Sequence, residues 1–284
     1  MEWRGQRKST NIEDRRGQGG IGRTAGRTGG VGVLAIVVIG YFLGVDLTPL
    51  LDQQGAPAQN QQGSATSESE REAGEFVSVV LAKTETIWQG IFKSSLNANY
   101  TAPTLVLYSQ STNSPCGGAS GATGPFYCPG DQKIYLDTAF FDTMQRDLGA
   151  SGDFAMAYVV AHEVAHHVQN EMGIMAQANQ IRQRSDQATS NAISVRIELQ
   201  ADCLSGIWAA QVQSQFGTIQ KGDFAEALNA AKQIGDDTLQ RNAGQRPMPH
   251  TFTHGTSAQR MAWFERGLSA TSLESCDTFS AANL

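Results

Sequence analysis

The sequence predicts an α+β fold, because its two clearest strand candidates come early and most of its helical segments come late. The strand candidates are the short runs TLVLYS at 104–109 and KIYLD at 133–137, which are rich in β-branched, aromatic and aliphatic residues. Apolar residues at helical spacing occupy 75–97 and then several segments from residue 153 onward. A regularly alternating α/β fold would instead place a helix after each strand.

The later helices have recognisable ends, since glycine commonly follows the last turn of a helix. The expected spans are 153–172 before Gly173, 191–216 before Gly217, a helix from Asp223 that ends before Gly235 or Gly244, and a short helix after Thr256 that ends at Gly267. Glu226 lies three residues after Asp223, so a capping box is expected there.

The first thirty residues are basic, and the rest of the chain is acidic. They carry seven Arg or Lys against three Asp or Glu, whereas residues 31–284 carry fourteen against twenty-four. A nucleic-acid-binding protein needs positive charge on its folded body, so no nucleic-acid partner is expected. Residues 1–28 are interpreted as a basic cytoplasmic arm.

An apolar segment follows this arm. Residues 31–45 (VGVLAIVVIGYFLGV) hold no charged side chain, and with Gly29 and Gly30 the run approaches the length that spans a bilayer. A buried core helix or a signal peptide could have a similar length. Because basic residues precede the run and Asp46 closes it, the sequence favours an uncleaved transmembrane signal-anchor at 29–47. One N-terminal helix would then hold the protein in the membrane, with the body outside the cytoplasm.

The rest of the chain divides into a linker and one domain. Residues 48–74 are rich in Gln, Ser, Gly and Ala and contain few apolar side chains, which predicts a flexible linker. Residues 75–284 have the length of a single domain.

The four cysteines fit a disulfide-bonded protein. Cys116 and Cys128 bracket a Gly-rich loop that a disulfide would close, and Cys203 and Cys276 would then pair. Four free or buried thiols are the alternative. An oxidising compartment favours the disulfides.

The segment HEVAH at 162–166 matches the HExxH zinc signature and lies inside a predicted helix, as that signature requires. His162 and His166 are about 40° apart around the helix axis and one turn apart along it, so both imidazoles can bind one metal ion. Glu163 is placed to reach a metal-bound water and take its proton. Chance occurrence is the alternative, but burying these polar groups in an apolar helix without a metal would cost several kcal/mol.

His167 is about 140° from His162 around this helix, so it cannot bind the same ion. A polar contact at a cleft edge is one interpretation of His167. The interpretation that we favour from the sequence is a partly exposed surface histidine.

A catalytic zinc needs a third protein ligand and one open position. Positions 169 and 172 hold Gln and Met, which excludes the metzincin pattern. In ELQAD (198–202), Glu198 and Asp202 are four residues apart on a predicted helix, so both can face the first helix. Glu198 is expected to bind zinc, and Asp202 to accept a hydrogen bond from a ligating histidine. An ordinary solvated acidic face is the alternative.

A hydrolase also needs a group that stabilises the oxyanion. His254 is the first candidate, followed by His250, Tyr158 and Tyr135. As an alternative, His254 could simply cap the helix that begins after Thr256.

The chain resembles a family of bacterial proteins, the "putative neutral zinc metallopeptidase" family, nearly from end to end. The resemblance is carried by the opening MEWRGQRKSTNIEDRRG, the apolar segment, YCPGDQKIYLD (127–137), HEVAHHVQ (162–169), ELQADCLSGIWA (198–209) and FTHGTSAQRMAWF (252–264). It implies a zincin-like, gluzincin-like domain in a single-pass protein of the bacterial inner membrane. By this resemblance His162, His166 and Glu198 bind one zinc ion, and Glu163 is the catalytic base.

These expectations favour a zinc peptidase that acts on peptide or protein substrates in the periplasm or outside the cell. The strand at 133–137 is a candidate sheet edge for an extended substrate. Two alternatives remain, a zinc-binding regulatory protein without catalysis and a zinc amidase that acts on cell-wall peptides.

Overall fold

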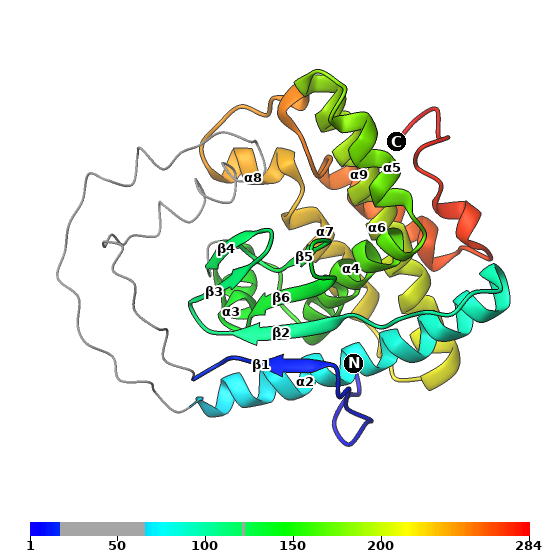
Figure 1. The fold of residues 1–284 in the computed structure, drawn as a ribbon. Coiled ribbons are helices and arrows are strands. Elements are labelled where there is room, and N and C mark those ends of the chain that lie inside the picture. The colour runs from blue at the N-terminus through cyan, green and yellow to red at the C-terminus, as the bar shows by residue number, and fades with distance from the viewer. Residues whose placement is uncertain (18–65, 121–122) are drawn as a thin grey trace.

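A computed structural model describes residues 1–17, 66–120 and 123–284. Within these residues the chain forms eight α-helices, a four-stranded mixed sheet and a two-stranded hairpin. The α+β prediction is therefore confirmed. The helices form most of the molecule, and the sheet lies at one side of them (Figure 1).

The sheet has the strand order β1-β2-β6-β5. Its strands are β1 (Ile12–Asp14), β2 (Thr104–Tyr108), β6 (Lys133–Asp137) and β5 (Phe126–Cys128). Both β1 and β6 run parallel to β2, and β5 runs antiparallel to β6. The strand at 133–137 is thus internal, so the expectation that it forms a sheet edge is wrong. The edges are β1 and β5, and β3 (Ser111–Ser114) and β4 (Gly117–Ser120) form the separate hairpin.

The helices follow the sequence prediction closely at most ends. They are α2 (Glu68–Ile91), α3 (Ala139–Arg146), α4 (Asp153–Glu171), α5 (Ile174–Arg182), α6 (Gln187–Phe216), α7 (Asp223–Gln233), α8 (Asp236–Asn242) and α9 (Ser257–Leu268). One π-helical turn, η2 (Phe92–Leu96), and two 3-10 turns, η3 (Pro249–Thr251) and η4 (Leu273–Cys276), complete the set. Helices α3 and α5 were not predicted from the sequence, and the predicted helix from Asp223 to Gly235 or Gly244 is divided into α7 and α8.

Helix α4 is the buried centre of the molecule. Fifteen of its nineteen residues are buried, and it packs against α2, α6, α7 and the strands β5 and β6. A helix that is apolar on all sides belongs inside a core. Any polar side chain on α4 therefore needs a partner.

Two glycines let α6 and α9 approach until their backbones touch. A Cβ atom on Gly206 would lie 2.2 Å from the carbonyl oxygen of Phe264, and one on Gly267 would lie 1.9 Å from that of Cys203. No side chain fits in either place. This contact brings the last turns of α9 against the middle of α6.

Both predicted disulfides are present, Cys116–Cys128 and Cys203–Cys276. The first joins the segment between β3 and β4 to β5. The second ties the C-terminal segment to α6.

The N-terminal boundaries differ from the prediction. Helix α2 begins at Glu68, where Ser67 and Glu70 form a capping box, so residues 68–74 are helical and do not belong to a flexible linker. Residues 12–14 form strand β1 of the sheet, so the first seventeen residues pack on the domain. The predicted anchor at 29–47 lies outside the described residues. Among the residues described, no helix combines the length and the apolar character needed to cross a membrane.

The predicted capping box at Asp223 is also wrong. Gly222 is the N-cap of α7 and makes no side-chain cap. The Glu226 carboxylate instead accepts a hydrogen bond from the backbone N–H of Phe154 at 3.0 Å and so caps α4. Glu226 therefore stabilises the beginning of the helix that carries HEVAH.

Candidate metal centre

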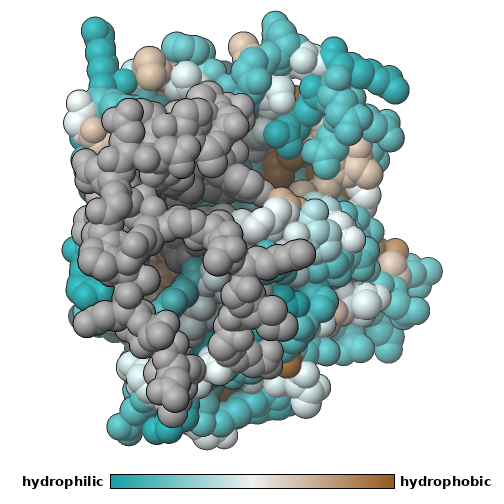
Figure 2. Space-filling model, turned by 60° about the vertical axis from the view of Figure 1, so that its left-hand side comes forward, coloured by the Kyte–Doolittle hydropathy of each residue, from teal (hydrophilic) through white to brown (hydrophobic). Residues whose placement is uncertain are grey.

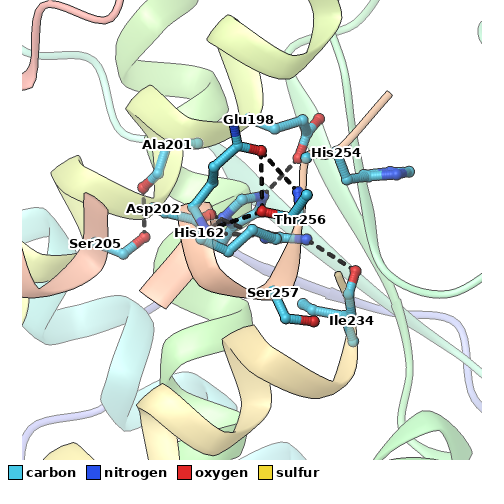
Figure 3. A network of polar contacts seen from close by, with 12 residues as sticks. His162, Glu198, Ala201, Asp202, Ser205, Ile234, His254, Thr256 and Ser257 are labelled. Carbon is cyan, nitrogen blue, oxygen red and sulfur yellow. Dashed lines mark hydrogen bonds and ion pairs between the residues drawn. The ribbon is translucent and has the colours of Figure 1, made fainter. Parts of the chain in front are cut away.

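The three predicted metal ligands meet between α4 and α6. His162 and His166 project from α4, and Glu198 projects from α6. Figure 3 shows His162 beside Glu198. Nε2 of His162 lies 3.1 Å from Oε2 of Glu198, and Nε2 of His166 lies 3.5 Å from Oε1 of the same carboxylate. One ligand atom from each residue falls within 4.8 Å of the other two.

These spacings fit a tetrahedral zinc ion. Zinc–nitrogen and zinc–oxygen bonds of about 2.0–2.2 Å at tetrahedral angles place neighbouring ligand atoms roughly 3.3–3.5 Å apart. The measured distances of 3.1 and 3.5 Å lie close to this range. Two imidazoles and one carboxylate also match the donor set of a catalytic zinc, which keeps its fourth position for water or substrate.

The outer nitrogen of each histidine has a partner that fixes the ring. Nδ1 of His166 donates to the side-chain oxygen of Gln169 at 2.9 Å, which leaves Nε2 free for a metal. Gln169 is itself held, because its amide donates to the carbonyl of Ile197 and to the side chain of Gln200. Nδ1 of His162 lies 2.9 Å from Oδ1 of Asp202, although its N–H does not point straight at that oxygen.

Asp202 is the centre of a buried network behind His162. It also accepts hydrogen bonds from the Tyr158 hydroxyl and from Nε and Nη2 of Arg260. Burial raises the pKa of Asp202, but the neighbouring Arg260 and His162 outweigh burial and hold that pKa below its ordinary value. Asp202 therefore remains a carboxylate and can fix the tautomer of His162.

Glu163 lies beside the ligand set and is buried, with 8% of its surface exposed. Burial raises its pKa, and the neighbouring imidazoles of His166 and His162 offset this effect only in part. A carboxylate with a raised pKa is suited to take up and release a proton near neutral pH.

His254 enters the site from the segment before α9. Its Nδ1 lies 3.0 Å from Oδ1 of Asp236, and the other oxygen of that carboxylate accepts the backbone N–H groups of Thr253, His254 and Gly255. Burial lowers the pKa of His254, but Asp236 and the charge of Glu198 outweigh burial and raise it above its ordinary value. The imidazole is therefore oriented by Asp236 and close to the metal ligands.

The other oxyanion candidates are placed differently. The Tyr158 hydroxyl is buried on Asp202, and the Tyr135 hydroxyl donates to Asp131. His250 is exposed in η3. Thr256, with Gln259, forms the capping box of α9, so the alternative that His254 caps this helix is wrong.

Comparison with known proteins agrees with this geometry. The model of the family described as "Putative neutral zinc metallopeptidase" matches residues 1–279. The chain belongs to this family.

The similarity between this chain and other members of the family covers nearly its whole length. The chain is 45% identical over 287 residues to the Escherichia coli K12 protein YpfJ, covering 98% of this chain and 99% of YpfJ. It is 38% identical over 257 residues to Rv2575 of Mycobacterium tuberculosis H37Rv, covering 86% of each chain. Both relatives are described as uncharacterized. No solved structure matches the chain.

His167 does not have the exposed position expected from the sequence. It is 1% exposed, and its Nε2 donates to the carbonyl oxygen of Thr101 while its Nδ1 accepts from the Tyr127 hydroxyl. Burial lowers the pKa of His167, which favours the neutral ring that this pattern requires. His167 therefore anchors α4 to β5 and to the segment before β2.

Three residues of the site were missed from the sequence, Gln169, Asp236 and Arg260. Gln169 follows His166 by three residues on one helix, so this spacing was a usable signal. Arg260 and Asp236 act through Asp202 and His254, which lie 58 and 18 residues away along the chain. No local pattern marks partners at such separations.

Proposed function

We propose that this chain is a zinc-dependent peptidase, with His162, His166 and Glu198 as the metal ligands. The observation that carries the proposal is the spacing of the three ligand atoms, with Nε2 of both histidines directed at one point and their outer nitrogens engaged elsewhere. A purely structural zinc site would close the fourth position with another protein ligand. No cysteine can do so, because all four are in disulfides.

Zinc at such a site polarises a substrate carbonyl and lowers the pKa of water to about 7. Glu163 takes the proton from the attacking water and passes it to the leaving amine. His254 donates a hydrogen bond to the carbonyl oxygen as negative charge develops there. Asp236 holds the ring of His254 in the required orientation.

The sheet offers one edge for an extended peptide against the helix that carries two of the metal ligands. Strand β5 is an edge of the sheet and contacts α4, whereas β1, at the other edge, lies along α2 (Figure 1). An edge strand can pair with a substrate backbone through main-chain hydrogen bonds. We therefore assign substrate binding to β5 in place of β6.

The two disulfides favour an oxidising compartment. We place the peptidase outside the cytoplasm for this reason.

The test uses the full chain, because its first residues belong to the fold. The wild type and Glu163→Gln are loaded with zinc and offered a degenerate peptide library and, in parallel, cell-wall peptides. Cleavage of library peptides by the wild type, lost by at least about 10²-fold in Glu163→Gln with equal bound zinc, is expected. Cleavage of cell-wall peptides alone would indicate the amidase, and a zinc-loaded wild type that cuts nothing would indicate a zinc-binding protein without catalysis.

A further inference from the structure

The first seventeen residues form part of the same folded unit as the metal centre. Strand β1 pairs in parallel with β2, in the register Ile12 to Leu105 and Asp14 to Leu107. Two flanking backbone hydrogen bonds extend this pairing, from Leu105 N to Asn11 O at 2.9 Å and from Arg15 N to Leu107 O at 2.7 Å. The N-terminal segment thus supplies a complete edge strand.

Apolar side chains of this segment enter the main core. Met1 and Trp3 are 5% and 8% exposed, and the Trp3 ring meets Phe76 of α2 edge to face with centroids 5.5 Å apart. Ser9 and Ser78 exchange two hydrogen bonds, one from the backbone N–H of Ser9 and one from the Ser78 hydroxyl. Burial of these two large apolar side chains stabilises the docked position of the segment.

The basic residues of the segment have acidic partners on the domain. Arg7 pairs with Glu85, Lys8 pairs with Glu75 and Arg4 pairs with Glu72, all on α2. The positive charge that resembles a cytoplasmic retention signal is therefore complementary to an acidic helix face of the same chain.

The α-ammonium group of Met1 is more buried than the side chains of the ion pairs on α2. It lies against the carboxylates of Asp153 and Asp223, at 3.2 Å from the latter. Asp153 is the first residue of α4, the helix that carries two metal ligands.

The chain leaves this unit and returns to it at the same place. The guanidinium group of Arg16 donates to the carbonyl of Glu70, and a Cβ atom on Gly74 would lie 2.5 Å from Nη2 of Arg16. The end of β1 and the N-terminal half of α2 lie side by side in Figure 1. Residues 17 and 66 are therefore exit and entry points on one face.

We propose that residues 1–17 dock permanently on the domain and lie in the same compartment as the metal centre. A chain that crossed a bilayer once between residues 17 and 66 would hold β1 and β2 on opposite sides and prevent their pairing. Residues 1–17 were expected to be part of a cytoplasmic arm. In this proposal they belong to the domain, to which they contribute an edge strand and core side chains. The proposal rests on packing alone and is independent of the proposed peptidase activity.

The first experiment compares the compartments of two exposed positions in the full chain. Gln6→Cys reports on the N-terminal segment, and Lys93→Cys in η2 reports on the domain; both side chains are exposed, and the native cysteines are all in disulfides. Intact cells with a permeable outer membrane are treated with a membrane-impermeant maleimide, before and after lysis. The same labelling at both positions is expected. Labelling of Lys93→Cys with protection of Gln6→Cys until lysis would overturn the inference.

The second experiment measures docking directly. Lys8→Cys and Glu75→Cys replace an exposed ion pair with 3.1 Å between its charged atoms. This pair meets at the ends of two long side chains, whereas a disulfide needs Cβ atoms about 3.5–4.5 Å apart. A bismaleimide about as long as the two replaced side chains should therefore join the two thiols within one chain. Lys8→Cys with Lys93→Cys is the matched control, because residue 93 lies eighteen residues further along the α2–η2 helix, roughly 27 Å from residue 75. Absence of the cross-link between positions 8 and 75, or equal cross-link yields from both pairs, would contradict docking.

Discussion

Arg260 and Asp202 form a bidentate ion pair inside the protein, with Nε and Nη2 of the guanidinium each 2.9 Å from a carboxylate oxygen. The two side chains are 2% and 0% exposed. Asp202 contacts both this guanidinium and His162, so Arg260 acts on a metal ligand through one intermediate residue. The pair therefore couples α9 to the metal centre.

Replacement of Arg260 should weaken the metal site without removing a ligand. Arg260→Met leaves the Asp202 carboxylate buried without its main partner, which should lower the free energy of unfolding by about 3–5 kcal/mol. Zinc affinity should fall about 10–100-fold, as when the hydrogen-bonding partners of metal ligands are changed. Chelator competition and denaturant unfolding of the metal-free protein measure these two effects separately.

Arg260→Lys serves as the matched variant. It keeps the charge but cannot form the bidentate contact, so zinc affinity should lie between those of the wild type and Arg260→Met. Wild-type zinc affinity in a folded Arg260→Met protein would contradict the coupling.

A substitution in the close contact between α6 and α9 should also reduce both stability and zinc affinity. Gly267→Ala would drive a methyl group into the Cys203 carbonyl, 1.9 Å away, so α9 must shift and move Arg260 from Asp202. Overpacking of this kind costs about 1–3 kcal/mol, and zinc affinity should fall with it. Gly90→Ala, in α2 with nothing within 4 Å, is the control and should be neutral or stabilising by up to about 1 kcal/mol. Equal melting temperatures for the two variants would refute the argument.

Asp236→Asn tests the orientation of His254. In the wild type, burial lowers the pKa of His254, but Asp236 and Glu198 more than compensate, so the imidazolium persists above its ordinary pKa of 6.5. Removal of the Asp236 charge lowers the pKa of His254, and the alkaline limb of kcat/KM should therefore move to lower pH. An unchanged alkaline limb would show that His254 does not control it.

The same pair contributes to stability within a defined range of pH. The pKa of Asp236 is lowered from 3.8, because hydrogen bonds and the His254 charge outweigh burial, so its contribution is present above pH 3.8 and is lost as pH falls. The pKa of His254 is raised from 6.5, so its contribution is present below pH 6.5 and is lost at higher pH. Asp236→Asn should therefore destabilise most between these values, by about 1.5–3 kcal/mol, in unfolding experiments at a series of pH values.

The parts of the site that were predicted from the sequence are pairs of residues that lie on the same helix. His162 and His166 share a helix face at a spacing of four residues, and the same spacing relates Glu198 and Asp202. The partners Arg260 and Asp236 come from other elements, so only the tertiary fold brings them to the site. Strong helical periodicity likewise predicted α4 and α6 within a few residues.

Strand β1 was not predicted from the sequence, for a physical reason. Strand β1 has three residues, which is too short to show an alternating pattern. The segment before this strand is held by side chains on α2, since Trp3 packs against Phe76 and Arg7 pairs with Glu85. Composition alone reveals the basic charge of the segment and gives no indication of these partners.

The described surface exposes few large apolar side chains. The described residues on the face shown in Figure 2 are mostly hydrophilic, with apolar side chains in small separate spots. The exposed large apolar side chains among the described residues are Leu96, Ile181 and Met248. Recognition of substrate on the described surface is therefore expected to depend on backbone pairing and the metal centre more than on a broad apolar face.

The two disulfides should differ in their effect on stability and on the metal site. Cys203 and Cys276 are 73 residues apart and Cys116 and Cys128 are 12 apart, so loop-closure entropy predicts losses of about 4 and about 3 kcal/mol on removal. Paired Cys→Ala variants, compared by denaturant unfolding, measure this difference.

The longer disulfide is linked to a metal ligand through a chain of side-chain hydrogen bonds. The carbonyl of Cys276 accepts a hydrogen bond from Gln200, and Gln200 accepts one from Gln169, which holds His166. Cys203→Ala with Cys276→Ala should therefore reduce zinc affinity as well as stability, whereas Cys116→Ala with Cys128→Ala should reduce stability alone. Equal zinc affinities in both variants would show that the chain of amide contacts from the C-terminal segment does not hold His166, and that Gln169 is positioned by Ile197 without it.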